Sequence, residues 1–198
     1  MTPPRPATND TPLRIIPLGG VGEIGKNMYV FEYGDDIVVI DCGLMFPDEE
    51  MFGIDLVIPD ITYLKERRGN VRAFIITHAH EDHVGALPYV LPEFPGVPVY
   101  ASILARGLLG NKIKEHKLHN NPLIGLEPGD ELPIGPFTVV PFRIGHSIPD
   151  AMGIALRRVG FWTAKLVATV RAVCFGGAAG SPAGTLDQPA AGAKPATW

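Results

Sequence analysis

The segment 77–83, Thr-His-Ala-His-Glu-Asp-His, concentrates three imidazoles and two carboxylates within seven positions. Histidine is the commonest metal ligand among protein side chains, and carboxylates complete hard or borderline metal sites. Along an extended loop His78 and His80 project to the same side, so both can reach one ion. Asp82 and His83 follow after the chain turns and can face a second ion nearby. The alternative is a solvated loop that happens to be rich in histidine, but the H-x-H-x-D-H spacing favours a metal site.

A further histidine, His146, follows the strand-like run 137–142. The preceding Gly145 lets the backbone approach closely. If His146 joins His78 and His80, the site has three histidine ligands and an open fourth position, which is the arrangement of catalytic zinc. Zinc in such a site lowers the pKa of bound water to about 7 and makes hydroxide available at neutral pH. Taken alone, His146 could equally be a hydrogen-bonded loop histidine.

Strands must position these side chains, because an apolar, β-branched run precedes each group. The run 73–77 leads into the histidine cluster, and the run 37–41 ends at Asp41. An aspartate at that strand end can accept hydrogen bonds from the metal loop and orient its histidines. The alternative for Asp41 is a simple turn-forming residue. The neighbouring Cys42 is better explained as buried packing than as a ligand, because thiolate ligands usually come in closely spaced sets.

The remaining elements are short. Strands are predicted at 13–18, 28–33, 97–101 and from 153 onward, and 34–36 is a hairpin turn signal. Helices are predicted at 61–67 with Asp60 as N-cap, around 88–91, and at 103–108 after Ser102, with 112–118 as a continuation. The chain divides into a proline-rich disordered leader at 1–12, a folded part at 13–156, and an Ala/Gly/Pro-rich tail at 157–198 that we expect to be disordered.

Composition sets outer limits on function. The 198 residues are 46% hydrophobic and 19% charged, as expected of a globular protein with a real core. The formal net charge of −4 gives no global sign of nucleic-acid binding, so phosphate contacts require a local patch or bound cations. With only two cysteines we expect no disulfide framework, and no apolar run reaches membrane-spanning length. We expect a cytoplasmic location and no membrane partner.

Two other patterns suggest different ligands. The run 20–25 matches G-x-G-x-x-G, but a dinucleotide site needs a helix to begin within the glycines, and 27–33 is predicted as a strand. We therefore expect a tight hairpin there and no NAD site. His116 and His119 could share a helical face, but the lysines around them would repel a cation. That basic face is instead the best local candidate for contact with a nucleic-acid backbone.

Together these motifs resemble the metallo-β-lactamase superfamily, and more closely the β-CASP ribonucleases of the ribonuclease J type. The resemblance covers about 13–156 and is carried by the segments 18–27, 41–43, 46–48, 78–83 and 145–150. It implies an α/β (α+β) fold, the αββα sandwich, of which this chain would supply mainly the first sheet and its flanking helices. The inner apolar face of that sheet would then lie bare, which favours aggregation.

The resemblance also implies a site and an activity. His78, His80 and His146 would hold one Zn²⁺, and Asp82 and His83 would contribute to a second, with Mn²⁺ or Mg²⁺ as substitutes. Asp82 and His83 would be the catalytic residues, Asp82 being the expected proton acceptor. Family members hydrolyse RNA phosphodiester bonds by endonucleolytic and 5′-to-3′ exonucleolytic cleavage, act in rRNA processing and RNA decay in the cytoplasm, and form homo-oligomers.

This chain also departs from the family pattern after residue 156. Family members continue with a strand ending in Gly-Asp-Phe-Lys, whose aspartate bridges both metals, and then with the β-CASP domain and a last histidine ligand. We find no counterpart of these in the sequence, and a reading-frame change would explain the Ala/Gly/Pro-rich end. The expectation is a truncated ribonuclease that is weakly active or inactive. The alternatives are a non-catalytic metal- or RNA-binding remnant and another superfamily hydrolase, acting on thioesters or lactams.

Overall fold

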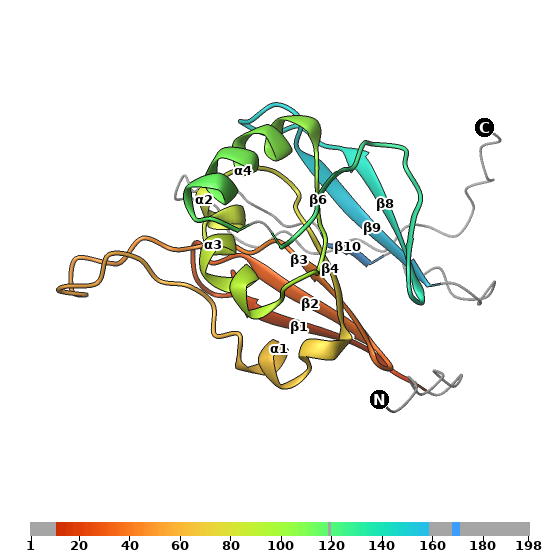
Figure 1. Ribbon diagram of the computed structural model, residues 1–198, viewed down its shortest axis with the longest axis horizontal. Helices are drawn as coiled ribbons and strands as arrows, with labels where there is room; N and C mark the ends of the chain where they lie inside the picture. The colour runs from red at the N-terminus through yellow and green to blue at the C-terminus, as the bar shows by residue number, and fades with distance from the viewer. Residues whose placement is uncertain (1–10, 119, 159–167, 171–198) are drawn as a thin grey trace, which may run out of the picture.

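The central strands consist of nearly continuous apolar residues that are buried on both faces of the sheet. These strands form the middle layer of the molecule. The computed structural model describes residues 11–118, 120–158 and 168–170. It has a layer of helices, a six-stranded sheet and a four-stranded sheet stacked on one another (Figure 1). Residues 1–10 of the predicted leader and most of the predicted tail lie outside the described residues, so the disorder expected there stays a prediction.

The larger sheet has the strand order β1-β2-β3-β4-β5-β6. Its strands are β1 (Leu13–Gly19), β2 (Met28–Tyr33), β3 (Asp36–Ile40), β4 (Val71–Ile75), β5 (Val99–Ala101) and β6 (Leu123–Gly125). The first three run antiparallel, and β3 to β6 run parallel. The β2–β3 connection is the predicted hairpin turn, in which Gly34 takes a φ of 62° that suits glycine.

Helices cover one face of this sheet. They are α1 (Thr62–Glu66), α2 (Glu81–Val84), α3 (Leu87–Val90) and α4 (Ile103–Glu115), with 3₁₀ turns η1 (Arg68–Asn70) and η2 (Leu91–Glu93). Val30 and Val39 pack in one core with Leu64, Leu87 and Leu109 from these helices. Helix α1 begins one residue later than predicted, and its N-cap is Ile61 and not Asp60. Oδ1 of Asp60 still accepts a hydrogen bond from the Thr62 amide at 2.8 Å. Helix α4 is longer than the predicted 103–108.

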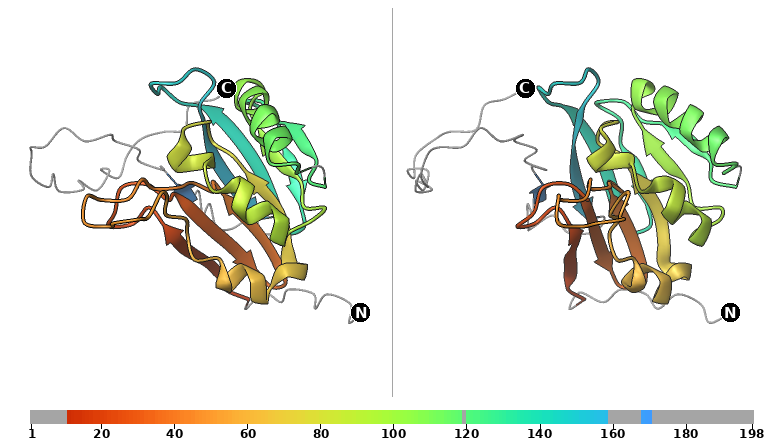
Figure 2. Two further views of the ribbon diagram at one scale, coloured as in Figure 1. Left: turned by 60° about the vertical axis from the view of Figure 1, so that its left-hand side comes forward. Right: turned by 90° about the vertical axis from the view of Figure 1, so that its left-hand side faces the viewer.

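A second sheet covers the other face, which corrects the expectation that this face lies bare. Its order is β10-β9-β8-β7, all antiparallel, with strands β7 (Leu132–Ile134), β8 (Phe137–Arg143), β9 (Met152–Arg158) and β10 (Ala168–Val170). Phe31 and Val38 of the first sheet share a core with Phe137, Val139 and Ile154 of the second. Figure 2 shows the two sheets facing each other. The stacking buries the apolar surface that an isolated first sheet would expose.

Strand β10 lies within the stretch that we expected to be a disordered tail. Ala168, Thr169 and Val170 pair with Leu156, Ala155 and Ile154 of β9. Regular structure therefore reaches past the predicted boundary near Leu156. None of the helices in the described ranges combines the length and the apolar character needed to cross a membrane.

The G-x-G-x-x-G run forms the predicted tight connection between antiparallel strands. Residues 20–27 link β1 to β2, and the chain continues as strand from Met28. No helix begins at these glycines, so the helix N-terminus that would bind a pyrophosphate is not there. The predicted tight connection is confirmed for this segment, and the expectation of no NAD site stays a prediction.

Candidate metal centre

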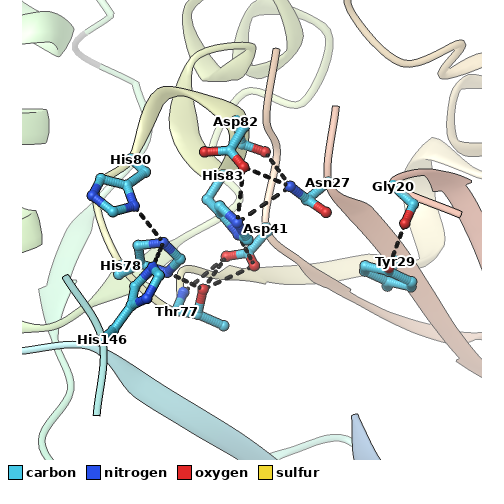
Figure 3. Close-up of polar contacts among 10 residues, drawn as sticks. All are labelled: Gly20, Asn27, Tyr29, Asp41, Thr77, His78, His80, Asp82, His83 and His146. Carbon is cyan, nitrogen blue, oxygen red and sulfur yellow. Dashed lines mark hydrogen bonds and ion pairs between the residues drawn. The ribbon is translucent and has the colours of Figure 1, made fainter. Parts of the chain in front are cut away.

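The candidate site lies at the carboxyl ends of two adjacent parallel strands. Asp41 directly follows β3, and the segment 76–80 follows β4. The Asp41 amide still donates to the carbonyl of Ile75 at 2.9 Å, so the two strand ends stay together beyond the sheet. The loop between β8 and β9 brings His146 to the same place from the second sheet. Sequence-distant side chains therefore meet where both sheets end (Figure 3).

His78, His80 and His146 converge as predicted. Nε2 of His146 lies 3.0 Å from Nε2 of His78, and Nε2 of His78 lies 3.1 Å from Nδ1 of His80. One ring nitrogen from each residue falls within 4.8 Å of the other two. Among the described residues, this is the one group of three or more His, Cys, Asp or Glu side chains that could hold a metal ion.

The environment favours the neutral form of two of these imidazoles, those of His78 and His146. Burial lowers the pKa of His78 from 6.5 to about 3, and the neighbouring rings of His83, His146 and His80 add to the effect. Burial and the neighbouring histidines likewise lower the pKa of His146. A neutral imidazole offers a lone pair, and ring nitrogens this close together can share one cation. An all-imidazole set of this kind suits Zn²⁺, so the residues present fit the implied metal.

Asp41 orders the loop that carries the histidines. Its side chain is fully buried, and its carboxylate accepts hydrogen bonds from the Thr77 amide at 2.8 Å and from the Thr77 hydroxyl at 2.9 Å. Oγ1 of Thr77 lies 2.9 Å from Nδ1 of His78. Because the hydroxyl donates to Asp41, its oxygen accepts from the His78 ring, which leaves Nε2 of His78 as the free lone pair. The hydrogen bonds predicted for Asp41 are present, and they define the metal-facing nitrogen.

Asp41 also holds a second histidine. Nδ1 of His83 lies 2.7 Å from Oδ2 of Asp41, so the ring donates to the carboxylate and turns Nε2 away from it. Nε2 of His83 lies 3.4 Å from Oδ2 of Asp82. The hydrogen bond with His83 is the largest cause that lowers the pKa of Asp82. Asp82 and His83 therefore lie together beside the three-histidine group, without being part of it.

Asn27 is a residue at this site to which the sequence assigned no role. Its Nδ2 donates to the backbone carbonyl of Asp82 at 3.0 Å and to Oδ2 of Asp82 at 3.1 Å. The same nitrogen lies 3.2 Å from Nε2 of His83. Asn27 is the last residue of the segment 18–27, which carries part of the family resemblance, and that was the available signal. Asn27 thus touches both side chains that were predicted as ligands for a second metal.

A glycine makes this contact possible. A Cβ on Gly43 would lie 1.6 Å from the Asp82 carbonyl oxygen and 2.7 Å from the His83 nitrogen. The Gly43 amide donates to the Asn27 carbonyl at 3.0 Å. Close approach of the backbone at Gly43 therefore lets the segment after β3 pack directly against the metal loop.

The other candidates lie apart from this group. Cys42 is fully buried in the helix-side core, and burial raises the pKa of its thiol, in agreement with a packing role. His116 is exposed on α4 with its ring 5.9 Å from that of Tyr89, and His119 lies outside the described residues. Glu81 forms an ion pair with Lys112 of α4 at 2.6 Å.

Comparison with known proteins agrees with this geometry. Residues 21–157 match the model of the metallo-beta-lactamase superfamily. The chain is 47% identical over 152 residues to a ribonuclease J of Thermus thermophilus, covering 73% of this chain and 26% of that protein. It is 44% identical over 153 residues to a ribonuclease J of Sinorhizobium meliloti, covering 75% of this chain and 27% of that protein. The chain spans about a quarter of the length of these relatives.

Solved structures share the fold. The short form of human tRNase Z superposes with a TM-score of 0.52 at 18% identity, over 74% of this chain and 65% of that one. The metallo-beta-lactamase fold protein YhfI of Bacillus subtilis gives a TM-score of 0.53 at 18% identity, over 74% of this chain and 58% of that one. Strand order, the convergence of three histidines and the match over 21–157 lead to one conclusion. The chain belongs to the metallo-beta-lactamase superfamily.

Proposed function

We propose that this chain is the metal-binding part of a ribonuclease that hydrolyses RNA phosphodiester bonds with zinc held by His78, His80 and His146. The observation that supports this most directly is that three imidazoles, carried by both sheets, bring one nitrogen each within 4.8 Å of the others. Similarity to proteins named ribonuclease J supports RNA as the substrate class. A cytoplasmic role in RNA processing and decay, by endonucleolytic and 5′-to-3′ cleavage in a homo-oligomer, belongs to the same proposal.

Each side chain has a defined task in this proposal. His78, His80 and His146 would hold a divalent cation, which would supply Lewis acidity toward water near neutral pH and positive charge toward the phosphate. Asp41 and Thr77 fix the tautomer of His78, so that its free lone pair faces His80 and His146. Asp82 stays ionised because the hydrogen bond with His83 lowers its pKa, and an ionised carboxylate beside the site can accept the proton of the attacking water.

Asp82 and His83 are the proposed ligands of a second cation, for which Zn²⁺, Mn²⁺ and Mg²⁺ are all candidates. Among the described residues, no third His, Cys, Asp or Glu joins them in a ligand group. A two-ligand site binds metal weakly, so we expect low activity from this chain. A non-catalytic metal-binding unit is the second candidate. It is favoured because Nδ2 of Asn27 already contacts Oδ2 of Asp82 and lies beside Nε2 of His83.

An RNA hydrolysis assay with added zinc or manganese tests the proposal, using RNA labelled at either end to separate internal from 5′-end cleavage. We expect slow turnover by the unmodified chain and none by His78→Ala. The matched control is His116→Ala, which removes an exposed imidazole outside the group. Equal activity of the unmodified chain and His78→Ala would contradict the nuclease proposal.

Metal stoichiometry, measured on the same samples, separates the two candidates. One zinc per chain without hydrolysis would favour the metal-binding unit, and no zinc would overturn both candidates. A chromogenic lactam and a thioester substrate assayed in parallel would reveal hydrolysis of another class.

A further inference from the structure

The loop that carries His146 joins β8 to β9, and one side chain of this loop reaches across to a helix. Oδ2 of Asp150 accepts a hydrogen bond from the Leu104 amide at 2.9 Å, although the two residues are 46 positions apart. The loop itself is largely exposed, with Ile144 40% accessible. Where the loop closes, the Ile144 amide lies 3.4 Å from the Ala151 carbonyl, which is a long hydrogen bond. Figure 2 shows this loop, drawn in cyan, beside the first turn of α4.

Asp150 performs a task that the sequence predicted for another residue. The first-turn amides of a helix lack intrahelical partners, and the residue that precedes the helix usually satisfies one of them. Ser102 occupies that position before α4, but its side chain makes no capping hydrogen bond. The carboxylate of Asp150 takes its place, and its negative charge also suits the positive end of the helix dipole. Helix α4 and the His146 loop are thereby tied to each other.

The backbone conformation at Asp150 also restricts which residues fit this position. Its φ of 69° lies in the left-handed region, where aspartate and asparagine are tolerated better than most residues. Two residues later, the Met152 amide donates to the Thr77 carbonyl at 3.0 Å, next to His78. The end of the loop, at residues 150–152, is therefore hydrogen-bonded to α4 through Asp150 and to the segment before His78 through Met152.

We propose that Asp150 is a positioning residue for His146: by fastening the loop to α4, it holds the His146 ring against His78. This proposal rests on the three-histidine site proposed above. Asp150 is not a ligand in it, because its carboxylate is turned to the Leu104 amide. Without the hydrogen bond between Asp150 and the Leu104 amide, the loop can move away from α4. The ring of His146 then lies next to His78 and His80 for a smaller fraction of the time.

Three substitutions separate the hydrogen bond from the backbone conformation. Asp150→Asn keeps an oxygen acceptor and tolerates the positive φ. Asp150→Gly tolerates the φ but removes the acceptor, and Asp150→Ala loses both. Asp130→Gly is the matched control, because Oδ2 of Asp130 accepts the Glu127 amide at 2.8 Å in an exposed turn away from the histidines.

The first measurement is zinc affinity by competition with a chromogenic chelator, with the visible spectrum of the Co²⁺-loaded protein as a report on coordination by three histidines. We expect Asp150→Gly and Asp150→Ala to bind zinc about 10- to 100-fold more weakly, as for other residues that orient ligands. Asp150→Asn should retain most of the affinity and the cobalt spectrum, and Asp130→Gly should retain both.

The second measurement needs no metal. Nuclear Overhauser contacts between the ring protons of His146 and His78 should be present in the unmodified protein and in Asp150→Asn, and lost in Asp150→Gly. Unchanged ring contacts together with unchanged zinc affinity in Asp150→Gly would overturn the positioning role. If the unmodified chain bound no zinc while the ring contacts depended on Asp150 as described, the metal proposal would fail and the positioning role would stand.

Discussion

Nδ1 of His83 lies 2.7 Å from Oδ2 of Asp41, and both side chains are fully buried. A buried carboxylate is stable only when hydrogen bonds replace its hydration. Asp41 receives them from the His83 ring, the Thr77 amide and the Thr77 hydroxyl. It does so from a left-handed backbone conformation, with φ of 60°. One carboxylate thus fixes the orientation of two neighbouring histidines, His83 directly and His78 through Thr77.

Replacing this carboxylate should destabilise the fold. Asp41→Ala leaves the buried donors of Thr77 and His83 without an acceptor, and we expect it to lower the free energy of unfolding by about 3 kcal/mol or more. Urea denaturation followed by circular dichroism measures the change. Glu66→Ala is the control, since 65% of that side chain is accessible and exposed substitutions change stability by only about 0.5 kcal/mol. Equal losses in both variants would contradict the assigned role of Asp41.

The hydroxyl of Thr77 should matter for metal binding as well as for the hydrogen bonding of Asp41. Thr77→Val keeps the shape but removes the acceptor that holds Nδ1 of His78, so the ring can take its other tautomer. We expect zinc affinity to fall about 10-fold. Chelator competition measures it, with Thr77→Ser expected to keep the affinity. Thr138→Val on β8 makes the same chemical change away from the site and should have no effect.

The lowered pKa values of His78 and His146 predict a pH dependence for the metal-free protein. The His78 pKa is about 3 in the folded chain and near 6.5 in the unfolded chain, so the unfolded chain binds more protons between these values. The free energy of unfolding therefore falls as the pH is lowered through this range. Urea titrations above about pH 5 isolate the histidines, because carboxyl groups titrate mainly below it. His78→Gln should flatten the dependence, and a wild-type slope in that variant would contradict the burial argument.

Gly43 should not tolerate a side chain. A Cβ there would meet the Asp82 carbonyl at 1.6 Å, so Gly43→Ala must displace backbone on one side of the contact. We expect a loss of about 2 kcal/mol or more in the free energy of unfolding. Gly107→Ala in α4 meets no atom within 4 Å and should instead raise it, by up to about 1 kcal/mol. Thermal melts of the two variants should therefore shift in opposite directions.

Local patterns in the sequence predicted the first sheet and the pair His78 and His80, because each depends on features within a few residues. His146 lies 68 positions from His78, and its place in the site was predicted from zinc chemistry and the family resemblance. The run before His78 is apolar and β-branched, and the turn at 34–36 carries its own glycine, so strand ends and ligands could be placed. The second sheet was underestimated. Its β7 spans only Leu132–Ile134 with a central proline, and β10 spans only Ala168–Val170 in a stretch without clean periodicity.

The contacts that complete the site have no local signal. Asn27 meets Asp82 across 55 positions, and Asp150 meets Leu104 across 46. Ser102 has the residue type and position of a helix cap, yet Asp150 supplies the hydrogen bond. Which partner wins such a competition depends on how the two sheets stack, and a linear pattern does not contain that information.

His78 and His80 follow a strand of the six-stranded sheet, and His146 follows a strand of the four-stranded sheet. An ion bound by all three would therefore cross-link the two sheets. Separation of the two sheets would then be thermodynamically coupled to dissociation of the ion. A chelator would accordingly loosen the sandwich itself, and saturating cation would hold its short outer strands in place.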